Sequence, residues 1–274
     1  MKYIKSTLQF LFVLDKGRRF LSLFLMILPT ALIVSFVFPL DIYIKWVATY
    51  DAHYDTLLAL WTSLQPASMT IGTFLLALFA IVISYSAYNT LTLRCFRVGV
   101  FTVKGFLRSA NENFFPAFYL VASLIIFYVF WQFILVLFLY LLQLSSSIAF
   151  IRLMSIILMI IWSVGLVFAL LPFVVWLPLM AINGFGPTKA FGLALQKAST
   201  RTIPIALSLG FLIAVIIGIN FLSGFLAISF LSTIVNTISF AFAFCYVSVL
   251  SMIVYFDIEA LTREDISRSL YFSR

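Results

Sequence analysis

The longest stretch of the chain without a charged residue most constrains its fold. Residues 202–256 include 55 consecutive positions with no Asp, Glu, Lys or Arg. As one α-helix this run would be about 80 Å long at roughly 1.5 Å per residue, whereas the hydrocarbon core of a bilayer is about 30 Å thick. We therefore predict two crossings, near 204–227 and 234–255, with a reversal near Ser229–Thr233.

The composition excludes a water-soluble globule. Of the 274 residues, 64% are hydrophobic and only 9% are charged, and the mean hydropathy is +1.19. The polar residues are too few to cover such a chain in water, whereas a bilayer is a suitable solvent for it. The chain is therefore predicted to be an integral membrane protein.

Four further charge-poor runs each predict one membrane-spanning helix. These spans are expected near 20–40, 68–93, 116–142 and 153–180, each about the length that one crossing needs. With the two spans above, the predicted fold is all-α, with six transmembrane helices in a single integral membrane domain over residues 1–274.

The distribution of Lys and Arg predicts the orientation. In a six-helix arrangement 15 of the 17 basic residues fall on one side, and only Lys45 and Arg152 fall on the other. The positive-inside rule then places both termini, including a tail at 257–274, in the cytoplasm. We predict a multi-pass protein of the inner (cytoplasmic) membrane.

The N-terminal residues 1–17 predict a short surface helix ahead of the first span. Ile4, Leu8, Leu11 and Phe12 recur at helical spacing, as in helices that lie in the membrane interface. The apolar stretch that follows is too long for a signal peptide, so the first helix is expected to be uncleaved.

Two basic connectors, 97–114 and 186–201, are predicted to be amphipathic helices of the inner interface. In the later one, Phe191, Ala194, Leu195 and Ala198 form the apolar stripe. We expect these stripes to face the acyl boundary and the basic faces to meet lipid phosphates or a partner protein. The basic residues predicted to make these contacts are Lys104, Arg108, Lys189, Lys197 and Arg201.

Catalytic and metal-binding patterns are sparse. The sole histidine, His53, lies between Asp51 and Asp55 in a segment that we interpret as a solvated loop rather than a metal site. Cys95 and Cys245 are interpreted as packing residues. The sequence has no histidine pair or Gly-rich phosphate loop, and we predict a non-enzymatic protein without a cofactor or metal.

Polar residues within the predicted spans are uncharged, which argues against ion coupling through a buried carboxylate. We interpret them as interhelical hydrogen-bonding groups; the alternative is that they line a path for a neutral solute. The candidates are Ser84, Tyr85, Tyr88, Asn89, Gln132, Gln143 and Asn220. In addition, Tyr128 and Trp131 lie too deep for an interfacial belt and predict contact with lipid or another helix.

The layout resembles a known family. A basic connector followed by a proline opens the span after the second and fourth helices, at Pro116 and Pro204, and Gly186–Ala190 has a Gly-x-x-x-Ala pattern. With the ending Tyr255–Ile258 and then Arg263–Asp265, the chain resembles the six-helix membrane domain of membrane-anchored glycerophosphodiester phosphodiesterases and related stand-alone prokaryotic membrane proteins. Because that family's catalytic part is a separate soluble barrel, the resemblance implies a non-catalytic domain.

Two functional hypotheses remain open. In the first, the protein binds lipid or partner proteins and supports membrane or envelope organisation. In the second, it is a permease or transporter subunit for a small neutral or amphipathic solute, with a path between repeats offset by 88 residues. Expected partners are anionic lipids of the cytoplasmic leaflet and a protein partner or second copy of the chain, with no nucleic acid. The tail residues Arg263, Glu264, Asp265 and Arg268 are interpreted as solvated; the alternative is that they dock onto the two inner connectors.

Overall fold

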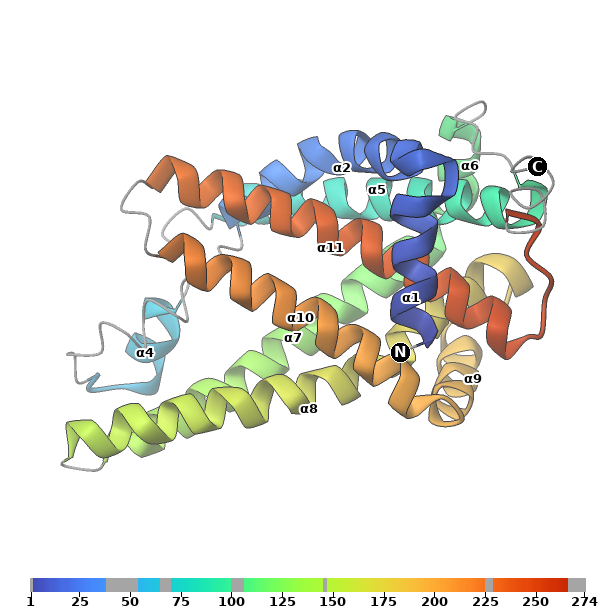
Figure 1. Ribbon diagram of the computed structural model, residues 1–274. Helices are drawn as coiled ribbons and strands as arrows, with labels where there is room; N and C mark the ends of the chain where they lie inside the picture. Colours follow the sequence, from blue (N-terminus) through green and yellow to red (C-terminus); the bar gives the residue numbers. More distant parts are fainter. Residues whose placement is uncertain are drawn as a thin grey trace.

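The protein is described here by a computed structural model that covers residues 2–37, 54–64, 70–99, 106–144, 147–224 and 229–265. All regular structure in these ranges is helical. Six helical segments are long and apolar enough to cross a membrane, which confirms the predicted all-α class with six spans. The spanning helices are α2 (Arg18–Val37), α5 (Ile71–Val98), α7 (Phe114–Leu142), α8 (Ile148–Asn183), α10 (Thr202–Gly224) and α11 (Ser229–Ile258) (Figure 1).

Four shorter helices complete the described fold. They are α1 (Lys2–Leu8), α4 (Leu57–Ser63), α6 (Phe106–Glu112) and α9 (Pro187–Ser199). The 13-residue helix α9 occupies the later predicted connector, 186–201. It opens with Pro187 in its first turn, where the missing backbone N–H of proline has no intrahelical partner to lose.

The earlier connector differs from the single helix predicted over 97–114. Helix α5 continues to Val98 and ends at Gly99, whose φ of 74° is left-handed. Glycine adopts this conformation without the steric cost of a Cβ and is therefore a common helix terminator. Helix α6 is a separate element of seven residues, and Lys104 lies outside the described residues.

The reversal between the last two spans also differs from its predicted position. Ser229–Thr233 are helical and belong to the start of α11, whereas α10 ends at Gly224. The length of the charge-free run 202–256 predicts that the chain reverses within it. Because no charged residue interrupts the run, the sequence does not indicate where the reversal lies.

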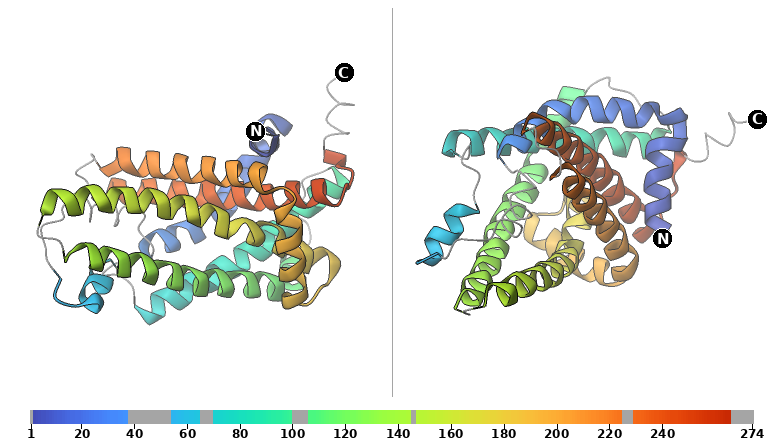
Figure 2. Two further views of the ribbon diagram at one scale, coloured as in Figure 1. Left: turned by 90° about the horizontal axis from the view of Figure 1, so that it is seen from below. Right: turned by 60° about the vertical axis from the view of Figure 1, so that its left-hand side comes forward.

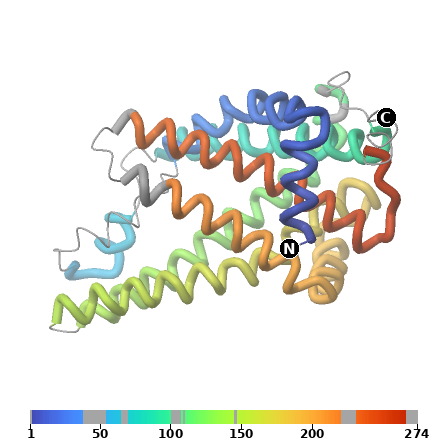
Figure 3. Tube along the Cα trace, in the orientation of Figure 1, coloured from blue at the N-terminus to red at the C-terminus, as the bar shows by residue number. Residues whose placement is uncertain are grey.

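The N-terminal segment is joined to the first span through a sharp break. Asp15, Lys16 and Gly17 all have positive φ angles, which separate the preceding helical turns from α2. Helix α1 consequently lies across the ends of α10 and α11 rather than in line with α2 (Figures 1 and 3). Its buried residues are Tyr3 and Thr7; in the turn that follows, Phe10 is buried whereas Phe12 of the predicted apolar stripe is exposed.

Helix α11 is the central helix of the bundle. It packs against α2, α5, α8 and α10, and α1 crosses its end. Within its most apolar window 67% of the residues are buried by protein, against only 11% for α8. The apolar surface of α8 is therefore available to lipid or to another protein, since burial inside this chain uses little of it.

Apolar packing is divided between one large cluster and two small ones. The large cluster joins α1, α2, α5, α7, α8, α9, α10 and α11 in the half of the bundle that contains α1 and α9. In the other half, α4 packs with the α7–α8 pair through residues such as Leu60, Leu135 and Ile151, while α2 packs with α5 through Val34 and Ala77. The α7–α8 pair diverges from α2 and α11 toward this end (Figures 1 and 2).

An aromatic contact holds α7 against α8. The Trp131 ring lies 4.3 Å from that of Trp162, measured between centroids, and a Cβ placed on Gly165 would be 3.3 Å from the Trp131 ring. Glycine at position 165 thus allows the close approach of the two helices. The predicted partner of Trp131 is therefore a helix of the same chain.

Candidate functional site

The two ends of the bundle differ strongly in charge. We call the end that carries α1, α6, α9 and residues 259–265 the basic end. Among the described residues, the basic side chains there are Lys2, Lys5, Lys16, Arg18, Arg19, Arg94, Arg97, Arg108, Lys189, Lys197, Arg201 and Arg263, and the acidic ones are Asp15, Glu112, Asp257, Glu259, Glu264 and Asp265. The described part of the opposite end carries Arg152 and Asp55. The basic end is therefore the candidate site for anionic ligands.

Two of the predicted lipid-contacting cations are paired with carboxylates of the same chain. Lys197 forms an ion pair with Glu259, and the Arg201 Nε lies 3.8 Å from the Asp257 Oδ2. Lys2 also pairs with Asp257, and the Tyr3 hydroxyl donates a hydrogen bond of 2.7 Å to the same carboxylate. These contacts connect α1 and α9 to the end of α11, so Lys197 and Arg201 contribute to tertiary structure.

Lys189 and Arg108 lie at the surface as predicted for contacts with an external partner. The Lys189 Nζ is 4.7 Å from the centroid of the Phe185 ring, a cation–π geometry. Arg108 lies 3.4 Å from Glu112 one turn along α6, and its side chain is 88% exposed. Exposed pairs of this kind are weak because water screens both charges.

Two residues that follow α11 form a buried ion-pair cluster with the start of α2. Asp265 lies 3.6 Å from the Arg19 Nη1 and 2.8 Å from the Arg263 Nη2, and Arg19 also pairs with Asp15. The Arg19 and Asp265 side chains are only 3% and 0% exposed. We call these four residues the clasp. The expectation of a solvated tail is thus wrong for Arg263 and Asp265, while Arg268 lies outside the described residues.

Aromatic rings surround this cluster. The Arg263 guanidinium lies 4.3 Å from the centroid of Phe96, which stacks on Phe10. Arg19 in turn lies 5.1 Å from Phe10. Sequence reasoning missed this arrangement because its members come from the two ends of the chain and from α5. The adjacent arginines Arg18 and Arg19 at the helix start were the only local signal.

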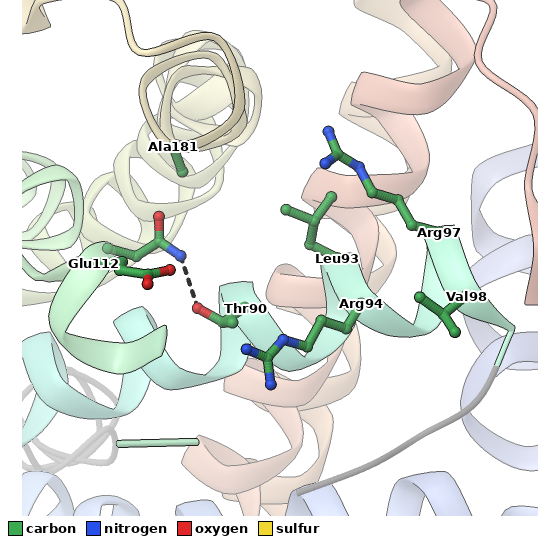
Figure 4. A pocket seen from close by; sticks show the side chains of 8 residues that line it. Thr90, Leu93, Arg94, Arg97, Val98, Glu112 and Ala181 are labelled. Atoms are coloured by element: carbon green, nitrogen blue, oxygen red, sulfur yellow. Dashed lines mark hydrogen bonds between the residues drawn. The ribbon is translucent and has the colours of Figure 1, made fainter. Parts of the chain in front are cut away.

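A pocket of about 320 Å³ opens at the basic end between α5, the α6–α7 junction and α8 (Figure 4). Arg94, Arg97 and Thr90 contribute from α5, with Glu112 and Asn113 from the junction and Ala181 from α8. The Asn113 amide donates a hydrogen bond of 2.7 Å to the Thr90 hydroxyl. The volume is within the usual range for a small-ligand site, and the sequence had pointed to neither Arg94 nor Arg97 as a site residue.

The predicted intramembrane polar residues are dispersed rather than gathered into one site. Ser84 bonds with Thr30 of α2 at 2.6 Å, and Tyr88 lies 3.4 Å from the Cys245 Sγ, as expected for interhelical hydrogen bonds. The Gln143 side chain accepts a hydrogen bond from the Tyr54 backbone. Asn89 is buried and neither polar atom of its side chain has a partner in the described structure.

The remaining intramembrane candidates differ in what the structure says of them. Gln132 on α7 is buried, and its Nε2 has no hydrogen-bond partner among the described residues. Asn220 falls in α10, but its side chain lies outside the described part. Tyr85 is buried on α5 and packs edge-on against Phe244 of α11.

Neither cysteine nor histidine forms a metal site in the described part of the chain. Cys95 and Cys245 are buried and free, on different helices. No group of three or more His, Cys, Asp and Glu side chains comes together in the described ranges. His53 and its flanking Asp51 lie outside them.

Comparison with known proteins adds no family to these observations, so the resemblance to the membrane domain of glycerophosphodiester phosphodiesterases stays a prediction. No family model, no curated protein and no solved structure matches the chain.

Proposed function

We propose that this multi-pass membrane protein binds anionic phospholipids at its basic end, without catalysis, and thereby acts in membrane or envelope organisation. By the positive-inside rule the basic end faces the cytoplasm, where the leaflet carries a negative surface potential. This orientation places the excess of basic side chains against anionic headgroups.

One observation carries the proposal. Lys5, Lys16, Arg18 and Lys189 are among the exposed cations that form no ion pair with a carboxylate within the described residues; we call these four the basic belt. A cation without an internal partner keeps its full attraction for an external anion. Each such residue near a membrane surface contributes about 1 kcal/mol to anionic lipid association.

Apolar side chains beside the belt support an interfacial position. Phe12 and Val13 are exposed next to Lys16 and Arg18, and Leu195 is exposed on α9 near Lys189. Adjacent apolar and basic side chains are typical of segments that insert shallowly at the headgroup boundary. The belt is therefore proposed to lie at the depth of the lipid phosphates.

Native mass spectrometry of protein released from nanodiscs tests this proposal. The nanodiscs contain phosphatidylglycerol and phosphatidylcholine, and the ratio of the two lipids retained is measured for wild type and for K5Q/K16Q/R18Q/K189Q. We expect the phosphatidylglycerol enrichment to fall by up to about five-fold per charge, and to fall in wild type as salt screens the belt.

The matched control is K5R/K16R/R18K/K189R, which keeps every charge and should keep the enrichment. Equal enrichment in wild type and the glutamine variant would refute the basic belt as a lipid-binding surface.

The permease hypothesis rests on one specific feature, the buried Asn89 amide of α5, which has no hydrogen-bond partner among the described residues. A buried polar group without a partner is costly in a folded protein, and a passing solute would supply the missing hydrogen bonds. Under this alternative N89L abolishes solute uptake into proteoliposomes, while lipid binding at the belt is unchanged.

A further inference from the structure

We propose that the pocket between α5, the α6–α7 junction and α8 binds a phosphate ester, the headgroup of an anionic glycerophospholipid. We call it the Arg94 pocket. This inference goes beyond the basic belt, because it assigns one saturable site to residues that the belt does not contain.

The charged residues of the pocket favour an anion. Arg94 and Arg97 stand on adjacent turns of α5, and both line the cavity (Figure 4). Among the described lining residues the acidic one is Glu112, and Arg108 lies 3.4 Å from it on the side of α6. Arginine suits phosphate because its planar donors match two oxygens at once.

The dimensions favour a headgroup larger than inorganic phosphate. A volume of about 320 Å³ equals the space of roughly ten water molecules. The Asn113 side-chain amide donates one hydrogen to Thr90, so its side-chain oxygen Oδ1 can accept a hydrogen bond from a headgroup hydroxyl. A phosphate ester with a hydroxylated alcohol, such as a glycerol headgroup, satisfies both kinds of group.

The pocket rim favours a lipid over a soluble phosphate ester. Leu93, Val98 and Ala181 supply an apolar part of the lining. Nearby, Leu107 of α6 and Phe115 of α7 are large apolar side chains that the protein leaves exposed. Acyl chains next to a bound phosphate would cover these side chains, which a soluble ligand leaves in contact with water.

Asn89 extends the polar character deeper into α5. It lies four residues before Leu93, and therefore one turn further from the basic end on the same helix face. Its amide is buried and has no hydrogen-bond partner in the described ranges, so it offers both a donor and an acceptor to a polar headgroup or to water that accompanies it.

Four charge variants test the pocket by native mass spectrometry, with phosphatidylglycerol titrated into the detergent-solubilised protein. We expect wild type to hold one phosphatidylglycerol more tightly than all others. R94Q/R97Q should weaken this site by about 25-fold, five-fold for each charge. E112Q should strengthen it, because the substitution removes a repulsive charge. V98E should weaken it, whereas V98Q, which differs only in charge, should not.

The variants also separate this inference from the proposed function. The belt variant K5Q/K16Q/R18Q/K189Q should lose general enrichment but keep the single tight lipid. A tight lipid retained unchanged in both R94Q/R97Q and V98E overturns the Arg94 pocket, and so does a wild-type protein that holds neither a tight phosphatidylglycerol nor glycerol 3-phosphate. Because Val98 and Arg97 are exposed, V98E stays informative if the double arginine variant does not fold.

Soluble probes identify the source of the phosphate. Glycerol 3-phosphate and inorganic phosphate are titrated against the same variants. Binding of glycerol 3-phosphate with the same dependence on Arg94 and Arg97, but no tight phosphatidylglycerol, supports the phosphate site and assigns it to a soluble ester.

Discussion

At the scale of single residues, the clasp is the feature with the clearest energetic consequence. Burying a charge costs several kcal/mol, which only close partners offset. Arg19 and Asp265 meet this condition through each other, Asp15 and Arg263. The clasp therefore makes Arg263 and Asp265, which follow α11, part of the folded core.

Neutralising Asp265 should destabilise the protein strongly. In D265N the buried Arg19 loses a charged partner, and breaking one side of a buried pair typically costs about 3–5 kcal/mol. The matched control R108Q breaks an exposed pair and should cost less than about 1 kcal/mol. Thermal unfolding in detergent, followed by circular dichroism, measures both. Equal midpoints for D265N and wild type would contradict the role of the clasp.

At the scale of helices, the apolar stripe of α9 has the predicted helical spacing, but it packs on α8 rather than on lipid. The structure buries Ala190, Ala194 and Ala198, spaced four apart, where α9 packs on α8. Leu195 of the predicted stripe is 49% exposed. The predicted acyl-facing stripe is thus largely a helix-packing face, and its small residues permit close contact.

Enlarging the centre of this stripe should separate α9 from α8. Ala194 is fully buried, so A194L adds volume to a packed contact, which typically costs about 1–3 kcal/mol. L195A changes the neighbouring exposed position and serves as control, with little expected effect. The unfolding midpoints of the two variants decide between a packing face and a lipid face, because a lipid-facing stripe would tolerate A194L.

The membrane-spanning helices could be predicted from the sequence because they depend only on the length and apolar composition of each run. The charge-free runs predicted six crossings, because charges are costly inside a bilayer, and six helices are long and apolar enough to cross one. The break at Gly99 was missed because helical periodicity continued across it, whereas the backbone conformation of one glycine ended α5. The clasp and the Arg94 pocket were missed because contacts between distant segments leave no periodic pattern.

At the scale of the whole molecule, orientation can be tested with thiol labelling. Cys95 and Cys245 are fully buried, so wild type should give little background with a membrane-impermeant maleimide. If the basic end is cytoplasmic, L144C at the opposite end should label in intact cells. T200C, exposed at the basic end, should label only after permeabilisation. The reverse pattern would contradict the positive-inside assignment.

Apolar packing is unevenly distributed along the bundle: one cluster holds the helices together at the basic end, and two separate clusters lie toward the opposite end. The large cluster unites nearly all the described helices at the basic end, while α7–α8 and α2–α5 have separate small clusters beyond it. With 36 residues, α8 is about 54 Å long at 1.5 Å per residue, well beyond the roughly 30 Å hydrocarbon core. Such helices tilt to fit the bilayer. A thinner bilayer is therefore expected to tilt α8 further, which would change the angle between the α7–α8 pair and the α2–α5 pair while their junction at the basic end stays packed.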